Sequence, residues 1–355
     1  MRILMLSHVD ALWIKQRPHF LAEALESAGC DVEFAYARAF DRSNLRGNTL
    51  ACRVRALVTV PNRLRHRMAF SFVDAVVQAL WGLVLVTRRP SIVWLTSPRL
   101  GVTARVLRSL GRARLVYDYM DRNALFDGVS NVVKDEERRL LTKADLVLCS
   151  SSALLDDVRA LGAGSRATLV RNALGAPEAW RVAPKTTFSG GEPLTLGYAG
   201  TVSSWFDRDL VVAALDANPL WTIRVWGPCD VDLGAHPRLA LEGVAAHADL
   251  PELFSQCDAM VMPFELTPLI EAVDPVKAYE YVATGLPVVL PRYRETDHFE
   301  PFAHRYTPGS PSSFTDAVRC AVDCSDSQPS LGAFTSANTW DRRIGDLMPQ
   351  LRALL

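Results

Sequence analysis

Residues 274–290 read DPVKAYEYVATGLPVVL and make up one complete helix-and-strand unit. Asp274 is a good helix N-cap, and Pro275 suits the first helical position because its ring fixes a helical φ. Gly285 stands where a helix commonly ends in a left-handed residue. The apolar residues 288–290 then indicate a buried strand. The stretch therefore predicts a short helix followed by a strand of a parallel sheet.

The start of this helix is a candidate anion site. A helix N-terminus presents free N–H groups and the positive end of the helix dipole, which suit a phosphate. Lys277 lies in the first turn, and Glu280 follows three residues later on the same face. A carboxylate there could accept hydrogen bonds from two ribose hydroxyls. The alternative is a plain surface ion pair, but Lys277 is the only lysine after Lys185, which favours a function.

Short apolar strands alternate with helical patterns along the rest of the chain. Such alternation predicts right-handed βαβ units and parallel sheets, so we expect an α/β protein with two Rossmann-like domains. The alternation stops between 175 and 193, where prolines and glycines gather. The predicted parts are a domain at 1–175, a linker at 176–193, a second domain at 194–336 and a C-terminal helix at 337–355. The predicted strands are 3–6, 32–36, 92–95, 115–117, 146–149, 168–170, 194–198, 222–226, 259–262 and 288–290.

The composition is that of a soluble globular protein. Of the 355 residues, 49% are hydrophobic and 22% are charged. Lys and Arg (39) balance Asp and Glu (39), so the net charge gives no reason to expect nucleic-acid binding. Residues 1–180 carry 26 basic and 17 acidic side chains, whereas residues 181–355 carry 13 and 22. The basic half could face an anionic surface or acceptor, or the asymmetry could be drift of surface charge.

Several common site signatures are missing. No GxGxxG follows the first strand and no GxxxxGK[ST] occurs, which counts against dinucleotide-dependent hydride transfer and P-loop phosphoryl transfer. The seven cysteines include no CxxC pair, so we expect no zinc site. Asp207 and Asp209 imitate a metal-binding DxD but open a predicted helix, where acidic residues suit the dipole. We therefore expect no metal and no cofactor.

Residues 68–87 are mostly apolar and just long enough to cross a bilayer. Asp74 and Gln78 interrupt them, so we predict a buried helix between strands. An arginine cluster before this helix also permits a position on an anionic membrane. Its members are Arg53, Arg55, Arg63, Arg65 and Arg67.

The helix predicted in the stretch 274–290 resembles, at residues 275–281, the P-x-K-x-x-E-Y helix of nucleotide-sugar-dependent glycosyltransferases of the GT-B fold. The similar branch includes bacterial exopolysaccharide, teichuronic acid and xanthan-type glucuronic acid transferases. Six further stretches are similar to segments of these enzymes and occur in the same order. They are 14–18 (IKQRP), 116–121 (VYDYMD), 144–150 (ADLVLCS), Arg171-Asn172-Ala173, 197–207 (GYAGTVSSWFD) and 257–264 (CDAMVMPF). The resemblance covers nearly the whole chain.

The resemblance implies roles for residues in both domains, which would face a cleft. Gly200 and Thr201 would approach the diphosphate, and Lys277 would hold it. Glu280 would bind the ribose, while Trp226 and Val244 would line the base pocket or simply pack in the core. On the acceptor side the implied residues are His8, Asp10, Arg17 and Asp121. The resemblance also implies that the last helix returns to the N-terminal domain and buries Trp340, Ile344 and Leu347.

Asp121 is the candidate for handling the acceptor hydroxyl. It follows the strand at 115–117, at the end where open parallel sheets bind ligands. A carboxylate there could take the proton of the attacking hydroxyl or orient it. Alternatively, Asp121 caps the loop 122–130 by bonding its backbone.

The implied reaction moves a sugar from a nucleoside diphosphate sugar, expected to be UDP-linked, to a hydroxyl group. The acceptor would be a saccharide or lipid-linked saccharide in cell-surface polysaccharide synthesis.

Ala272 stands eight residues before Glu280, where many retaining relatives have a second glutamate, so the stereochemical outcome, retention or inversion, stays open. A GT-B-fold nucleotide-sugar epimerase and a catalytically silent nucleotide-sugar-binding subunit are the alternatives. The first residues lead into a strand rather than a signal peptide, so we expect a cytoplasmic protein. A peripheral position on the inner face of the plasma membrane stays open.

Overall fold

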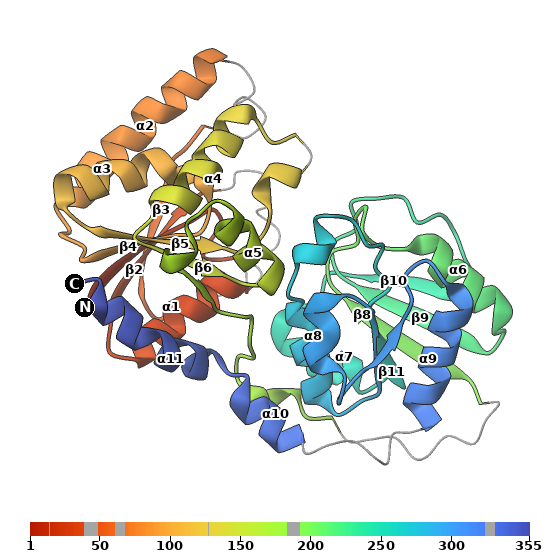
Figure 1. Cartoon of the computed structure of the whole chain (residues 1–355). Coiled ribbons are helices and arrows are strands. Elements are labelled where there is room, and N and C mark those ends of the chain that lie inside the picture. The colour runs from red at the N-terminus through yellow and green to blue at the C-terminus, as the bar shows by residue number, and fades with distance from the viewer. Residues whose placement is uncertain (14, 39–48, 61–67, 127, 183–191, 324–330) are drawn as a thin grey trace. The chain divides into compact units, whose positions relative to one another are not determined.

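A computed structural model describes residues 1–13, 15–38, 49–60, 68–126, 128–182, 192–323 and 331–355 of the chain (Figure 1). The chain forms two compact units. Unit 1 comprises Met1–Arg171 and Trp340–Leu355, and unit 2 comprises Asn172–Thr339.

Unit 1 is built on a parallel sheet with helices on both faces. Its strands are β1 (Arg2–Ser7), β2 (Asp31–Ala37), β3 (Arg53–Leu57), β4 (Ile92–Leu95), β5 (Arg114–Tyr119), β6 (Leu146–Cys149) and β7 (Ala167–Leu169). Its helices are α1 (Arg17–Ser27), α2 (Met68–Val86), α3 (Gly101–Gly111), α4 (Asn131–Lys143), α5 (Ser152–Ala160) and α11 (Trp340–Ala353). The strand order is β3-β2-β1-β4-β5-β6-β7. In Figure 1, α1 and α11 lie on one side of the sheet, and α2 and α3 lie on the other.

Unit 2 repeats this plan with six parallel strands in the order β10-β9-β8-β11-β12-β13. The strands are β8 (Leu194–Ala199), β9 (Trp221–Trp226), β10 (Leu239–Gly243), β11 (Ala259–Val261), β12 (Val288–Pro291) and β13 (His304–Tyr306). The helices are α6 (Arg208–Ala217), α7 (Leu250–Phe254), α8 (Val276–Thr284), α9 (Pro311–Asp323) and α10 (Leu331–Ala337). All residues of β11 and β12 are buried, as expected for central strands covered on both faces.

The two parallel sheets confirm the predicted α/β fold with two Rossmann-like domains. Strands β3, β10 and β13, which lie at sheet edges, were not predicted from the sequence. Four of the five residues of β10 are exposed, so this strand has no apolar run to reveal it. Edge strands are commonly polar because only one side of their backbone pairs with a neighbour.

The division between the units differs from the predicted linker at 176–193. Unit 2 begins at Asn172. Trp180 is 2% exposed and packs on Phe254, with ring centroids 5.9 Å apart, so this part of the stretch belongs to the core of unit 2. Residues 183–191 lie outside the described residues.

The prediction that residues 68–87 form a buried helix is wrong for one face. They form α2, but Phe72 is 72% exposed and five other apolar side chains of α2 are also exposed. The interrupting residues Asp74 and Gln78 are buried instead. Among the described residues, no helix has both the length and the apolar character that a bilayer crossing requires.

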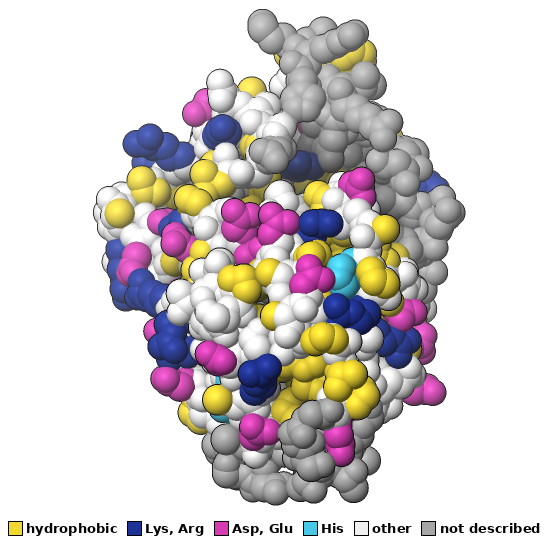
Figure 2. Space-filling view, turned by 90° about the vertical axis from the view of Figure 1, so that its right-hand side faces the viewer, with side chains coloured by type: hydrophobic (Ala, Val, Ile, Leu, Met, Phe, Trp, Pro, Cys, Tyr) yellow, Lys and Arg dark blue, Asp and Glu magenta, His cyan; other side chains and the backbone are white. Residues whose placement is uncertain are grey.

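Part of the positive charge of the first half is neutralised locally. Arg53 and Arg55 on the edge strand β3 form ion pairs with Asp31 and Glu33 of β2. These pairs leave less free charge than the composition of residues 1–180 suggests. Figure 2 shows the side of the molecule on which Figure 1 draws unit 2, and there basic and acidic side chains are interspersed rather than gathered by sign.

The last helix begins at Trp340 rather than at Ala337, because α10 ends at Ala337 and belongs to unit 2. Within unit 1, the Trp340 ring stacks on Phe20 of α1 with centroids 5.8 Å apart. The buried residues of α11 recur every three to four positions, as on one face of a helix. They are Trp340, Ile344, Leu347 and Leu351.

The substitution Ile344→Ala should therefore destabilise the full chain in urea unfolding. Ile344 is fully buried, and truncating a buried isoleucine to alanine typically costs about 2–5 kcal/mol. The control Asp346→Ala changes a side chain of the same helix that is 65% exposed, and should shift the free energy by less than about 0.5 kcal/mol. Equal effects of the two substitutions would show that α11 does not pack as described.

Candidate functional site

Each sheet has one place where its strand order reverses. The reversal lies between β1 and β4 in unit 1 and between β8 and β11 in unit 2. Open parallel sheets bind ligands beyond the carboxyl ends of their strands at such a point. In unit 2 this directs attention to Gly200 and Thr201, which follow β8.

Two glycines bring backbone segments unusually close at this edge of unit 2. Gly200 follows β8 with φ 151°, and Gly227 follows β9 with φ 146°. The Gly200 N–H donates to the carbonyl of Trp226 at 2.7 Å. A Cβ on Gly227 would lie 2.1 Å from the Gly200 carbonyl oxygen, which no side chain could tolerate. Both positions therefore require glycine.

The side chain of Lys277 crosses the backbone of Gly200. A Cβ on Gly200 would lie 1.8 Å from Lys277 Cε and 2.5 Å from Nζ. Lys277 comes from the first turn of α8, and its Nζ lies 5.9 Å from the ring centroid of Tyr198. Burial lowers the pKa of Lys277, and the Glu280 carboxylate opposes that shift. Unit 2 thus brings together the helix N-terminus, Lys277 and Gly200, three elements that suit a bound phosphate.

Tyr281 fixes α8 against the end of β8. Its hydroxyl accepts from the Ala199 N–H at 2.8 Å and donates to the Ala199 carbonyl at 3.3 Å. Because Ala199 immediately precedes Gly200, this contact sets the distance between the strand end and the lysine. The sequence motif contains Tyr281, but its role appears only in the folded chain.

Asp274 does not cap α8 as predicted. The N-cap is Pro275, which makes no side-chain cap hydrogen bond. The buried Asp274 carboxylate instead accepts from the Asn172 N–H at 2.7 Å and from the Tyr279 hydroxyl at 3.2 Å. The first residue of unit 2 is therefore fastened to the segment that begins α8, and the first N–H groups of α8 have no side-chain cap.

Glu280 has a partner that the sequence analysis missed. Its Oε1 lies 2.8 Å from Nε2 of His247, and Glu280 is 8% exposed. The His247 ring in turn meets the edge of Trp180, with centroids 5.1 Å apart. Because His247 lies 33 residues from Glu280 and in no motif, no sequence signal points to it. This contact orients the carboxylate that follows Lys277 by one turn.

The three other residues expected near the nucleotide lie in different environments. Trp226 is 4% exposed and belongs to the hydrophobic core of unit 2, which agrees with the packing alternative. Val244, just after β10, is 45% exposed. Thr201 is half-buried, and its carbonyl accepts from the Tyr198 hydroxyl at 2.9 Å.

In unit 1, three of the predicted residues, His8, Asp10 and Asp121, follow the carboxyl ends of β1 and β5, and Arg17 begins α1. His8 is exposed, and its Nδ1 lies 3.3 Å from Thr96 Oγ1, which follows β4. Asp10 is 7% exposed and holds the turn after β1, because its Oδ1 accepts from the Leu12 N–H at 3.0 Å. Arg17 is not a free cation, since its buried guanidinium is paired with Asp118, with Nη2 2.9 Å from Oδ1.

Asp121 lies beside this buried ion pair. The pKa of Asp121 is raised to about 6. Burial is the largest cause of this rise, the positive charge of Arg17 opposes it, and the negative charge of Asp118 adds to it. Its carbonyl, not its carboxylate, accepts the N–H of Asn123 at 2.9 Å. Among the described residues, no hydrogen bond or ion pair engages the half-buried Asp121 carboxylate. The loop is therefore held without this carboxylate, which stays available for other partners.

Asp207 performs the structural role that its position predicts. Its side chain accepts from the Leu210 N–H at 2.9 Å and caps α6. In the described parts of the chain, no three His, Cys, Asp or Glu side chains are grouped so that they could hold a metal ion.

Sequence comparison relates the chain to known glycosyltransferases. Residues 14–173 match the family described as "Glycosyl transferase 4-like domain". A Bacillus subtilis protein assigned to teichuronic acid biosynthesis as a glycosyltransferase is 29% identical over 200 residues, 53% of this chain. The match spans half the length of that curated relative.

Structural comparison establishes the fold. Sucrose-phosphate synthase from Thermosynechococcus elongatus superposes with a TM-score of 0.78 at 16% identity, covering 100% of both chains. HepE from Anabaena, solved with UDP-glucose, superposes with a TM-score of 0.72 at 14% identity, covering 99% of this chain and 100% of HepE. The chain therefore has the GT-B fold of glycosyltransferases.

The contact between Gly227 and Gly200 predicts that Gly227→Ala is destabilising. The added Cβ would overlap a backbone oxygen that cannot swing aside, and such overpacking costs about 1–3 kcal/mol in addition to backbone strain. Gly309→Ala is a matched control, because Gly309 also has a positive φ (72°) but open space around its Cβ position. Urea unfolding should show a clearly larger loss for Gly227→Ala, and equal losses would contradict the close approach.

Proposed function

We propose that this protein is a glycosyltransferase that moves a sugar from a nucleoside diphosphate sugar to a hydroxyl group. The observation that carries the proposal is the Lys277 side chain lying across Gly200, at the end of β8. An ammonium group there, next to the uncapped N-terminus of α8, suits the diphosphate of such a donor. The match of residues 14–173 to a glycosyltransferase family supports the same conclusion.

Lys277 and α8 would stabilise the leaving group. When the bond from the sugar to the diphosphate breaks, negative charge grows on the diphosphate oxygens, and a preorganised cation lowers the barrier. A diphosphate could approach the backbone at Gly200 and Thr201 without meeting a side chain at 200, and the Thr201 N–H could donate to it, because the Gly200 N–H is already bonded to the Trp226 carbonyl. Glu280, oriented by His247, would accept hydrogen bonds from the ribose. Val244 would lie beside the base.

Asp121 would serve as the base for the acceptor hydroxyl. Its carboxylate is half-buried, and a pKa of about 6 leaves it mostly ionised at neutral pH yet more basic than an ordinary aspartate. His8 and Asp10, at the end of the neighbouring strand β1, are the next candidates. Arg17 would act on the acceptor side through Asp118 and Asp121 rather than by direct contact.

We propose UDP as the nucleotide and a saccharide or lipid-linked saccharide of a cell-surface polysaccharide as the acceptor. The support for UDP is the HepE structures, which were solved with UDP, with UDP-glucose, and with UDP and glucose. The support for a polysaccharide is the relative assigned to teichuronic acid biosynthesis. Release of free UDP only in the presence of acceptor would distinguish transfer from epimerisation and from silent binding.

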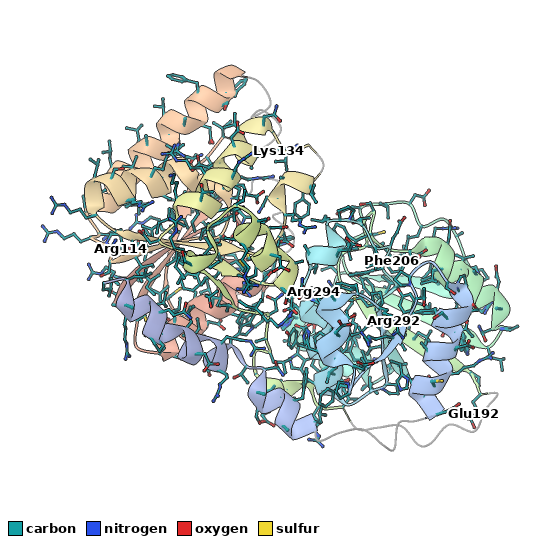
Figure 3. All side chains as sticks on the ribbon, viewed as in Figure 1. Arg114, Lys134, Glu192, Phe206, Arg292 and Arg294 are labelled. Atoms are coloured by element: carbon teal, nitrogen blue, oxygen red, sulfur yellow. The ribbon has the colours of Figure 1, made fainter. Side chains whose placement is uncertain are left out.

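Lys277→Met tests the diphosphate site while keeping the aliphatic chain over Gly200. Hydrogen bonds to charged groups contribute about 1.5–3 kcal/mol, so UDP affinity measured by calorimetry should fall about 10- to 100-fold. Gly200→Ala should weaken UDP binding too, because its Cβ displaces the Lys277 ammonium. Lys134→Met, on α4 of unit 1 (Figure 3), is the matched control and should leave affinity unchanged. Normal affinity in Lys277→Met would remove Lys277 from the site.

Asp121→Asn tests the base. The variant should bind UDP normally but lose about 10²–10⁴ in turnover with a saccharide acceptor, because an amide cannot accept the proton. In the native protein a base must be ionised, so the rate should fall as the pH drops through about 6. The variant should lack this dependence. Near-normal turnover in Asp121→Asn would direct the search to His8 and Asp10.

A further inference from the structure

The outer face of α2 is an uninterrupted apolar stripe. Six exposed apolar side chains recur at helical spacing along it. They are Phe72 (72% exposed), Val73 (47%), Val76 (44%), Leu80 (56%), Leu83 (51%) and Val84 (51%). A helix on the surface of a globular protein normally points its polar residues outward, so this arrangement is reversed. In Figure 3, the side chains on the outer side of α2 project away from the rest of unit 1.

Asp74 and Gln78 of α2 are buried, and their hydrogen bonds fix the rotation of the helix. Asp74 accepts from the Val60 N–H at 3.0 Å and from Gln78 Nε2 at 2.7 Å. Gln78 Nε2 also donates to the Arg99 carbonyl at 2.8 Å, and Thr103 of α3 donates to the Gln78 carbonyl at 3.0 Å. Turning the apolar stripe inward would break these buried hydrogen bonds. The stripe is therefore held outward by the structure rather than left there by chance.

Close packing against α3 holds the helix in the same position. A Cβ on Gly82 would lie 2.6 Å from Cβ of Val106, so the two helix backbones approach at the glycine. The Trp81 indole N–H donates to the Val58 carbonyl at 3.0 Å, which ties α2 to the segment after β3. The helix cannot leave unit 1 without losing these contacts, so the stripe is presented on a rigid support.

The stripe has basic side chains at one end. Arg88 and Arg89 come shortly after the end of α2 and are exposed, and Arg88 Nε also lies 3.8 Å from Glu33 Oε2 of β2. Arg112, which ends α3, is also exposed, and the neighbouring Leu110 is 60% exposed. From residue 70 to residue 86, the only acidic side chain is Asp74, and it is buried. An apolar surface of this kind bordered by cations is complementary to an anionic lipid bilayer.

We propose that α2 is a membrane-docking helix whose exposed stripe enters the headgroup and acyl boundary of an anionic bilayer. The helix lies flat, because Asp74 and Gln78 keep its opposite face bound to unit 1. Arg88, Arg89 and Arg112 contact the lipid phosphates. The proposal complements the proposed use of a lipid-linked acceptor, but it rests on α2 alone, and its test does not use the transfer reaction.

The test is sedimentation of the full chain with vesicles of phosphatidylglycerol and phosphatidylethanolamine, and with neutral phosphatidylcholine vesicles. The native protein should sediment with the anionic vesicles, less so as salt is raised from 50 to 300 mM. The double variant Phe72→Ser, Leu80→Ser should bind at least tenfold less. Both side chains are exposed, so its melting temperature and UDP affinity should stay native.

Leu220→Ser combined with Leu241→Ser is the matched control. These leucines of unit 2 are 53% and 51% exposed, and their loss should not change vesicle binding. Vesicle binding that is equal in the native chain and the α2 variant would overturn the proposal. So would the absence of binding by the native chain. A dimer in solution that the α2 variant dissociates would assign the stripe to a second copy of the chain and would also overturn it.

Discussion

The side chain of Lys277 can lie across the end of β8 only because Gly200 has no side chain. Gly227, which follows the neighbouring strand β9, must also lack a side chain, because its backbone lies against the Gly200 carbonyl. Tyr281 holds the other side of this arrangement by bonding both backbone groups of Ala199. These contacts hold the end of β8 close to the end of β9 and to the N-terminus of α8. A side chain at Gly200 or Gly227 would force these segments apart. The proposed diphosphate site depends on this close approach.

The proposed acceptor-side chemistry would depend in the same way on a pair of residues, Arg17 and Asp118, that is not itself the reacting group. Arg17 and Asp118 are both buried, and neither charge could remain there without the other. Burial raises the pKa of Asp121, the charge of Arg17 lowers it, and the charge of Asp118 raises it. A carboxylate that is desolvated but not bonded to its own loop differs from the surface aspartates of this chain. This environment makes Asp121 a better candidate base than its sequence position alone suggests.

The sequence predicts the parts of the fold that continuous apolar runs and helix signals encode. Strands β4 and β6 match the predicted ranges, and Gly285 ends α8 in a left-handed conformation as expected. Edge strands such as β10 escape prediction because they bury little. Contacts between distant residues escape it as well: the hydrogen bonds of Asp274 to Asn172 and the pairing of His247 with Glu280 involve no local pattern. The outward direction of the apolar face of α2 could not be predicted, because an apolar stripe at helical spacing normally indicates a buried face. It follows only from the hydrogen bonds that keep Asp74 and Gln78 inside.

Hydrogen exchange measured by mass spectrometry, with and without nucleoside diphosphates, tests the central claim most directly. UDP, GDP, dTDP and ADP would be added separately to the full chain. The account predicts that one of them slows exchange in peptides covering 199–203 and the first turn of α8, and that Lys277→Met abolishes this protection. Protection confined to other segments, or no protection by any of the four, would contradict the assignment of the diphosphate to the end of β8.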